Sequence, residues 1–227
     1  MIYTRRHLLG AGAAAGLFAT TAKGSTLAQI VAGLKDPAPS RPVAASVPAR
    51  PKVMVDPIVN PQLLARARAA FDRNRSRLRH TDIVGITDFS RASGEQRFFL
   101  LDTNSGRVSR HFVSHGRGSD PAHSGFLERF SNRIGSEASS EGAYLTGDFY
   151  QGKYGRSMRL KGLDRSNDNA EARAIVVHSA WYAEPDVIDQ HGKLGRSEGC
   201  FAFGRDSLRE VLSRLGPGHL LYADKLA

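Results

Sequence analysis

The sequence has only one cysteine, Cys200, and one tryptophan among its 227 residues. A single cysteine excludes an internal disulfide framework, because a bridge needs two thiols. The sequence also lacks the close histidine or cysteine pairs that are typical of zinc sites, so we expect no metal. No apolar run is long enough to predict a transmembrane span, and no repeat is present. The composition, 41% hydrophobic and 24% charged, is that of a globular protein with a core.

Acidic residues are fewer than basic ones, 22 against 32, which gives a formal net charge of +10. An excess of positive charge favours an acidic polymer as partner. Nucleic acid, an anionic membrane and cell-wall glycan all meet this description, so charge alone leaves the partner open.

The first 28 residues predict export. Arg5 and Arg6 precede a Gly/Ala-rich apolar run, and small residues at Thr26 and Ala28 suit a signal peptidase. The order Thr-Arg-Arg-His-Leu-Leu resembles a twin-arginine signal, which would deliver the protein to the periplasm of a Gram-negative bacterium. A buried Ala/Gly-rich helix or a membrane anchor is the alternative. Export favours the cell wall over nucleic acid as the partner.

The sequence predicts three segments: a signal peptide over 1–28, a proline-rich tether over 29–59 and a folded domain over 60–227. Alternatively, the last ten residues of this tether form an ordered arm that packs on the surface of the domain. Asn60 and Pro61 predict a helix start, and 206–215 predicts a second helix. The runs between them are short and β-rich with glycine or polar turns, so we expect a mostly β domain with helices at its edges (α+β).

The candidate chemistry lies between Ile175 and Phe203. His178 ends the strand-like run AIVVHSAW, and Cys200 ends the Gly-bounded turn GRSEGC, 200 − 178 = 22 residues later. A loop of that length can return to the same sheet edge and bring a histidine to a thiol, the pair used in nucleophilic catalysis. Gly199 frees the backbone to aim consecutive N–H groups, from Glu198 to Cys200, as an oxyanion hole.

Two other interpretations of this region stay open at this point. Cys200 can be an inert core residue near an unrelated histidine. A zinc site made from His178, His191 and Cys200 is the other alternative, although its spacing is not typical of zinc.

HSAW, a loop and S-x-G-C together resemble the YkuD-type L,D-transpeptidases of bacterial cell walls. Over 82–221 the sequence is most similar to the murein L,D-transpeptidase catalytic domain family, in six ordered blocks: RFFLLD, SHGRGSD, FSN, SSEGAYLTGDFYQGKYGRSMRLKGLD, NDNAEARAIVVHSAWY and GKLGRSEGCFAF. The resemblance implies a β-sandwich-like catalytic fold, peptidoglycan stem peptides as the partner, and no cofactor, metal or nucleic acid. A monomer is expected.

The resemblance also implies roles for single residues. Cys200 would be the nucleophile and His178 the general base, the Ser179 carbonyl would orient the imidazole, and the backbone at Gly199 and Cys200 would supply oxyanion donors. Residues expected to line the substrate site are Tyr154, Arg159, Tyr182, His191, Arg196, Ser197 and Glu198.

Glu198 departs from the family pattern, which commonly has histidine at that position. A carboxylate beside the sulfur disfavours the thiolate unless it points away or meets Arg196.

The implied reaction is acyl transfer through a cysteine thioester, which links a stem peptide to diaminopimelate as a 3–3 or a 1–3 cross-link. A carboxypeptidase or endopeptidase that uses the same pair is one alternative. A non-catalytic wall-binding module and a basic polyanion-binding protein are the others.

Overall fold

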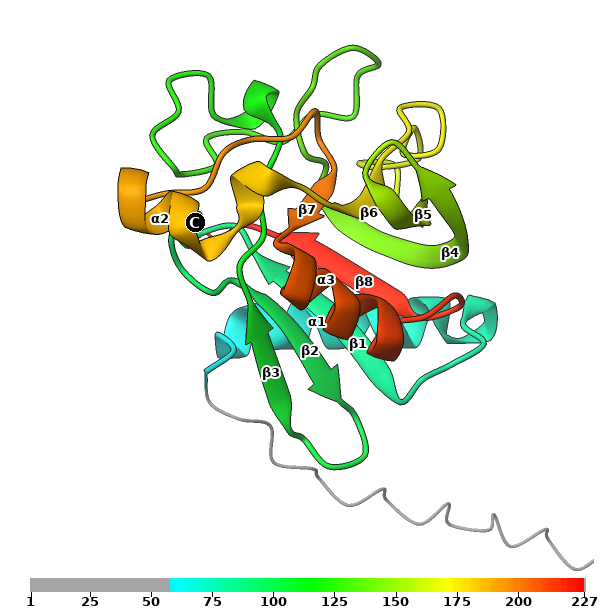
Figure 1. Ribbon diagram of the computed structural model, residues 1–227. Helices are drawn as coiled ribbons and strands as arrows, with labels where there is room; N and C mark the ends of the chain where they lie inside the picture. The colour runs from blue at the N-terminus through cyan, green and yellow to red at the C-terminus, as the bar shows by residue number, and fades with distance from the viewer. Residues whose placement is uncertain (1–57, 227) are drawn as a thin grey trace, which may run out of the picture. The chain divides into compact units, whose positions relative to one another are not determined.

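The computed structural model describes residues 58–226 (Figure 1). The predicted signal peptide, and the predicted tether except Ile58 and Val59, lie outside the described residues. Within 58–226, no helix is both long enough and apolar enough to cross a membrane.

Within the described part of the chain, eight strands form one sheet in the order β3-β2-β1-β8-β4-β5-β6-β7. The strands are β1 Ile83–Asp88, β2 Phe98–Asp102, β3 Val108–His111, β4 Gly142–Gly152, β5 Gly155–Gly162, β6 Val176–Ser179, β7 Phe201–Phe203 and β8 Leu220–Asp224. The helices are α1 Pro61–Asn74, α2 Pro185–His191 and α3 Arg205–Arg214, with short 3₁₀ turns η1 Arg75–Arg77, η2 Arg117–Ser119 and η3 Trp181–Ala183. The prediction of a mostly β domain with a few helices is confirmed.

The sheet curls until its two edges meet. Ser114, three residues after β3, pairs with Ala202 of the opposite edge strand β7, and its amide donates to the Ala202 carbonyl at 2.9 Å. The sandwich-like expectation therefore takes the form of one sheet bent back on itself. The short edge strand β7 therefore has hydrogen-bond partners on both sides, and fewer of its backbone groups remain unpaired at the sheet edge.

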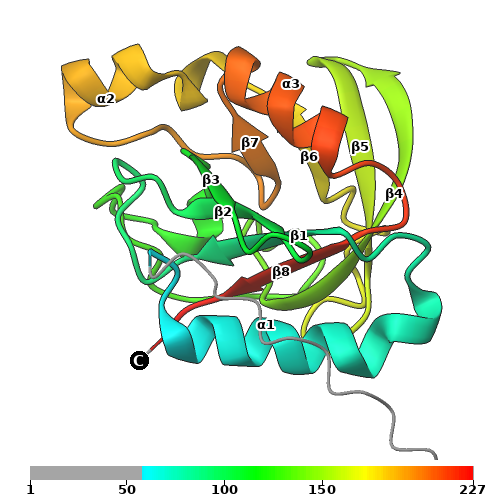
Figure 2. The same ribbon diagram turned by 90° about the horizontal axis from the view of Figure 1, so that it is seen from below.

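Helix α1 covers one face of the sheet, where it contacts β1, β4 and β8 (Figure 2). The predicted start is confirmed, because the Asn60 side chain accepts from the Gln62 amide at 2.8 Å and Pro61 is the first helical residue. Leu63, Ala67 and Ala70 are buried in the cluster beneath it. Val59 is 2% exposed and joins the same cluster, so this residue of the predicted tether packs with the domain.

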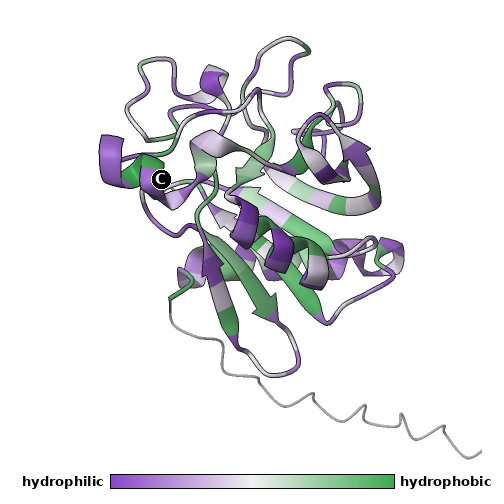
Figure 3. Cartoon of the chain, viewed as in Figure 1, coloured by the Kyte–Doolittle hydropathy of each residue, from purple (hydrophilic) through white to green (hydrophobic). Residues whose placement is uncertain are grey.

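The core lies on both faces of the central strands. On β1, Val84 and Ile86 pack under α1, whereas Ile83 faces the second cluster with Phe98, Phe203 and the buried side of α3. This period-two division follows from the pleat, which sends successive side chains to opposite faces. Figure 3 shows the result as apolar strands surrounded by polar loops and helix surfaces.

The predicted helix over 206–215 agrees with α3 within one residue. The segment between His178 and Cys200 was expected as a loop, and this is wrong in part because α2 forms within it. Pro185 stands at the helix start and Gly192, with φ +70°, at its end. This proline-first, glycine-last pattern is a helix signal that sequence reasoning could have used.

Leu63 offers a test of how much the α1 contact stabilises the domain. It is fully buried, so Leu63→Ala should lower the free energy of unfolding by about 2–5 kcal/mol, the range for a buried leucine. Arg68→Ala, on the exposed side of the same helix, should change it by less than about 0.5 kcal/mol. Urea unfolding followed by circular dichroism measures both, and equal effects would show that α1 is not part of the core.

Candidate active site

The predicted catalytic residues lie on or next to two strands, β6 and β7, that pair in parallel. His178 lies opposite Ala202, and Cys200 stands two residues before Ala202. Cys200 itself lies in the bend that leads into β7, so the register brings the two residues to neighbouring strands. Phe201 and Phe203 point into the core.

His178 is held in one orientation. Its Nδ1 lies 2.8 Å from the Ser179 carbonyl oxygen, and the Tyr154 ring stacks on the imidazole at 4.6 Å between centroids with a 20° interplanar angle. The Ser179 hydroxyl in turn donates to the Tyr154 carbonyl at 2.9 Å. Burial lowers the pKa of His178 and thereby favours the neutral imidazole.

The turn before Cys200 is fixed by its own side chain and by glycine. The Ser197 hydroxyl donates to the Cys200 carbonyl at 2.7 Å. Gly199 has φ +110°, and a Cβ there would lie 2.6 Å from the Ala138 carbonyl oxygen, so only glycine fits. The Gly199 amide differs from the expected oxyanion role, because it donates to the Ser197 hydroxyl at 3.2 Å.

Cys200 is partly exposed, and its thiol donates to the Ala174 carbonyl at 3.5 Å. Burial raises the pKa of the thiol. A backbone hydrogen bond from Val176 opposes this increase, the Glu198 carboxylate adds to it, and the Arg173 guanidinium opposes it. The resting sulfur is therefore a thiol that needs a base before it can act as a nucleophile.

Glu198 pairs with an arginine that sequence reasoning missed. The expected partner was Arg196, but the carboxylate lies 3.4 Å from Arg117 Nη2. Arg117 is also bonded by both Nε and Nη2 to Glu137. The Glu198 side chain is 72% exposed, so water screens much of its effect on the sulfur.

Arg173 is a second residue that sequence reasoning missed. Its guanidinium donates to the carbonyls of Ser131 and Ala138 and to the Ser140 hydroxyl. A Cβ on Gly199 would lie 3.0 Å from Arg173 Nη2, which places this cation beside the turn that precedes Cys200. The signal was present in the block NDNAEARAIVVHSAWY, where the arginine precedes the histidine strand.

A buried network supports the turn from below. Arg97 Nη2 lies 2.7 Å from His115 Nδ1, and His115 Nε2 lies 3.2 Å from Asp120. Burial and the Arg97 charge lower the pKa of His115 to about 3, so this histidine stays neutral. The His115 carbonyl accepts from the Ser197 amide at 2.9 Å. His115 therefore positions the turn through its backbone.

The other predicted substrate residues lie at different places. Arg159 pairs with Val176 across β5 and β6, so it shares the face of His178, and its guanidinium covers the Tyr150 ring at 4.6 Å. Arg196 donates to the carbonyls of Asp120 and Pro121. Tyr182 and His191, the remaining two, are described next.

Tyr182 is half-buried against the cluster of Ala180, Leu194 and Ala202, where burial raises the pKa of its phenol. His191 ends α2 and is exposed. Within residues 58–226, no group of three or more His, Cys, Asp or Glu is arranged to hold a metal ion. The zinc alternative thus finds no cluster in the described residues.

A comparison with protein families places this geometry in context. The model of the L,D-transpeptidase catalytic domain (YkuD_2) matches residues 56–223, which include β1 to β7 and nearly all of β8. The chain belongs to the L,D-transpeptidase catalytic domain family. Its members are the proteins that the ordered sequence blocks indicated.

Several solved structures are similar to this chain at low sequence identity. LdtMt1 in complex with imipenem is 15% identical, with 63% of this chain and 59% of that chain covered and a TM-score of 0.38. L,D-transpeptidase 1 of Mycobacterium tuberculosis is 12% identical (62% and 60% covered, TM-score 0.34). The helical cell shape determining protein Pgp2 from Campylobacter jejuni is 10% identical (64% and 48%, TM-score 0.40).

The chain spans about three fifths of the length of the first of these structures. No curated protein is similar enough to the chain to count as a match.

Gly199 gives a test of the nucleophile turn in this transpeptidase domain. Gly199→Ala combines a positive φ with a clash at the Ala138 carbonyl, whereas Gly155→Ala has φ +83° and nothing within 4 Å of the added methyl. The control should lose about 1–2 kcal/mol of stability from backbone strain alone. Gly199→Ala should lose more and should also slow alkylation of Cys200. Equal losses in thermal unfolding would contradict the close packing of the turn.

Glu198 gives a test of the thiol's electrostatics. Its negative charge disfavours the thiolate and raises the pKa of Cys200, so Glu198→Gln should lower that pKa. The pH midpoint of the iodoacetamide alkylation rate should then move to lower pH. Asp206→Asn removes the same charge from the exposed surface of α3 and should leave the midpoint in place. A midpoint unmoved by Glu198→Gln would show that the carboxylate does not act on the sulfur.

Proposed function

We propose that this protein is an exported L,D-transpeptidase in which Cys200 and His178 join peptidoglycan stem peptides through a thioester. The observation that supports the proposal most is the β6–β7 register, in which His178 is paired with Ala202, two residues after Cys200 and its glycine-dependent turn. Membership of the family supports the substrate class.

The hydrogen bonds of His178 support its role as the base. A carbonyl oxygen only accepts, so Nδ1, 2.8 Å from the Ser179 carbonyl, carries the ring proton. The neutral ring then has its lone pair on Nε2, ready to take a proton. The lowered pKa of His178 and the raised pKa of Cys200 both favour the neutral pair at rest. Base and thiol thus begin the reaction in the required protonation states.

The first half of the reaction forms the thioester. Cys200 turns about its χ1 bond from the Ala174 carbonyl toward His178, the thiol proton passes to Nε2, and the sulfur attacks the carbonyl carbon of an L-configured residue. The Cys200 amide donates to the oxyanion. The C–N bond to the following D-residue breaks, and the proton on Nε2 passes to the leaving amine.

The second half uses the side-chain amine of a diaminopimelate on a neighbouring stem. The amine attacks the thioester carbonyl, His178 takes its proton, and the C–S bond breaks. The thiolate recovers the proton and the free thiol is restored. Attack on the third stem residue gives a 3–3 link, and attack on the first gives a 1–3 link. Removal of residues 1–28 takes away Arg5, Arg6 and Lys23 and no acid, and the remaining formal charge of 10 − 3 = +7 favours contact with the anionic wall.

The test uses the full chain, its Cys200→Ala variant and diaminopimelate muropeptides, with products analysed by mass spectrometry. We expect new dimers from the wild type and none from Cys200→Ala, and fragmentation assigns the donor residue. Shortened monomers alone would identify a hydrolase. Identical results for the two proteins would overturn the proposal and favour a wall-binding module.

Imipenem gives an independent test of the thiol. Since LdtMt1 was solved in complex with imipenem, we expect a mass increase of one imipenem on the wild type and none on Cys200→Ala. Labelling of both proteins would place the reactive group elsewhere.

The pH dependence follows from the burial of His178. Burial disfavours the charged imidazolium and lowers its pKa from 6.5, so the acid limb of kcat/KM should have its midpoint below 6.5. Tyr154→Ala uncovers the ring and should raise the midpoint toward the ordinary value. Tyr154→Phe keeps the stacked ring and should leave it unchanged. An acid limb at or above 6.5 in the wild type would contradict a buried histidine base.

A further inference from the structure

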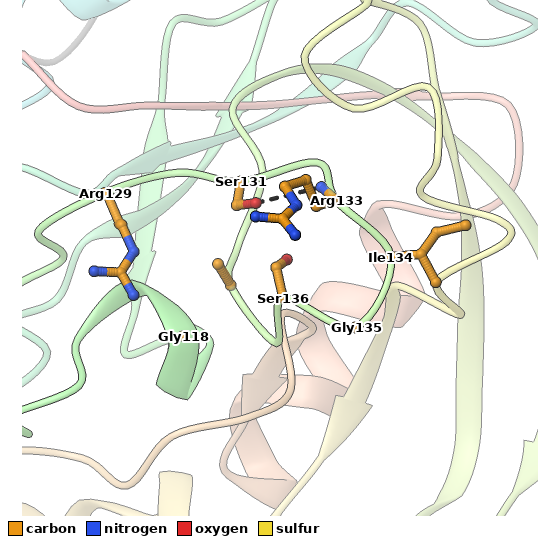
Figure 4. A pocket seen from close by; sticks show the side chains of 8 residues that line it. Gly118, Arg129, Ser131, Arg133, Ile134, Gly135 and Ser136 are labelled. Carbon is orange, nitrogen blue, oxygen red and sulfur yellow. Dashed lines mark hydrogen bonds between the residues drawn. The ribbon is translucent and has the colours of Figure 1, made fainter.

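A cavity of about 320 Å³ lies beside the nucleophile turn, and none of the roles described above uses it (Figure 4). It is formed by the loop after η2, and its lining includes Arg129, Arg133, Ile134 and Ser136. We propose that this cavity is a subsite that binds a carboxylate of the stem peptide; the inference rests on the proposed function.

The charges around the cavity are unbalanced. Within residues 58–226 the side chains of Arg129 and Arg133 make no ion pair or hydrogen bond, and Figure 4 shows both guanidinium groups at the cavity. On the same loop the Glu137 carboxylate pairs with Arg117, and the exposed Glu128 is not among the residues that line the cavity. Two unpaired guanidinium groups are a suitable receptor for a carboxylate, which they can bind with charge-assisted hydrogen bonds.

Ser136 adds a donor without a partner. Its Oγ is buried and makes no hydrogen bond within the described residues, and Figure 4 shows it on the cavity side facing Arg133. A buried hydroxyl without a partner is costly in free energy. A ligand oxygen that accepts from Ser136 would remove that cost.

An exposed apolar residue at the cavity favours an organic acid over an inorganic anion as the ligand. Ile134 lines the same cavity and is 71% exposed. An exposed isoleucine beside two arginines suits a carboxylate that is carried on an aliphatic chain, as in the glutamate and diaminopimelate residues of a stem peptide.

The cavity also shares a wall with the catalytic turn. Ala138 lines it, and its carbonyl lies 2.6 Å from a Cβ placed on Gly199. Arg173 bonds the carbonyls of both Ser131 and Ala138, so the cavity wall and the residue before Cys200 are fixed to each other. A peptide extending a few residues from the sulfur, at about 3.3 Å per residue, can place a carboxylate there.

The experiment measures binding without catalysis. In the full chain carrying Cys200→Ala, calorimetry compares the tetrapeptide L-Ala-γ-D-Glu-diaminopimelate-D-Ala with versions amidated at the glutamate or at the diaminopimelate carboxylate. Adding Arg129→Gln and Arg133→Gln should weaken binding of the free tetrapeptide about tenfold, as loss of a charge-assisted contact does. Arg68→Gln, on the exposed side of α1, is the matched control and should have no effect.

The amidated peptides identify the group. One amidation should cost the parent protein about tenfold and cost the double arginine variant nothing further, because both changes remove one interaction. Independent, multiplying losses would overturn the proposal, as would unchanged binding in the arginine variants or no binding by the parent. Equal competition by inorganic phosphate at the same concentration would also overturn it, since a general anion site would then be the simpler account.

Ser136→Ala separates binding from folding. Removing an unpaired buried hydroxyl should leave thermal stability equal or higher, while tetrapeptide binding weakens. Lower stability with unchanged binding would assign Ser136 a structural role and overturn its part in the subsite. A wild type that binds through the arginines but transfers no acyl group would overturn the proposed function and leave the subsite intact.

Discussion

The site depends on one backbone junction, where the curled sheet closes on itself at Ser114 and Ala202. The closure brings the segment after β3 against the strand that follows Cys200. From there the chain continues as a second ladder, in which His115 and Arg117 exchange backbone hydrogen bonds with Ser197. The turn before Cys200 is thus held by a strand pair on one side and a buried loop on the other. Rigid support of this kind is what a reactive side chain needs to keep its geometry.

Arginine performs three different tasks around this junction. Arg97 is fully buried and holds the support loop, and burial lowers its pKa to about 9. Arg173 ties the 131–140 loop to the turn and adds a positive charge near the sulfur. Arg117 joins the carboxylates of two loops, Glu137 and Glu198. The basic composition that first suggested a polyanion partner is in part structural, because these planar donors fix loops that have little regular secondary structure.

Much of the fold could be predicted from the sequence, because its signals are local. Asn60-Pro61 sets the start of α1, and the alternation along β1 and β8 follows the pleat. The strand that carries His178 and the turn before Cys200 could be predicted, and their joint catalytic role stays a prediction. The partners of Glu198 and His115 could not be found this way, since Arg117, Arg97 and Asp120 meet them only through the closure of the sheet. Contacts between distant segments depend on topology, which local patterns do not encode. Helix α2 was missed although its proline and glycine were visible.

The raised pKa of Cys200 has a consequence for the chemical lifetime of the protein. Peroxide and other oxidants attack the thiolate much faster than the thiol. A sulfur that burial and Glu198 keep protonated is therefore a slow target for conversion to sulfenic acid. The sequence holds no second cysteine that could trap such a product as a disulfide. The raised pKa thus protects the thiol from oxidation, and a variant with a more acidic thiol should be oxidised faster.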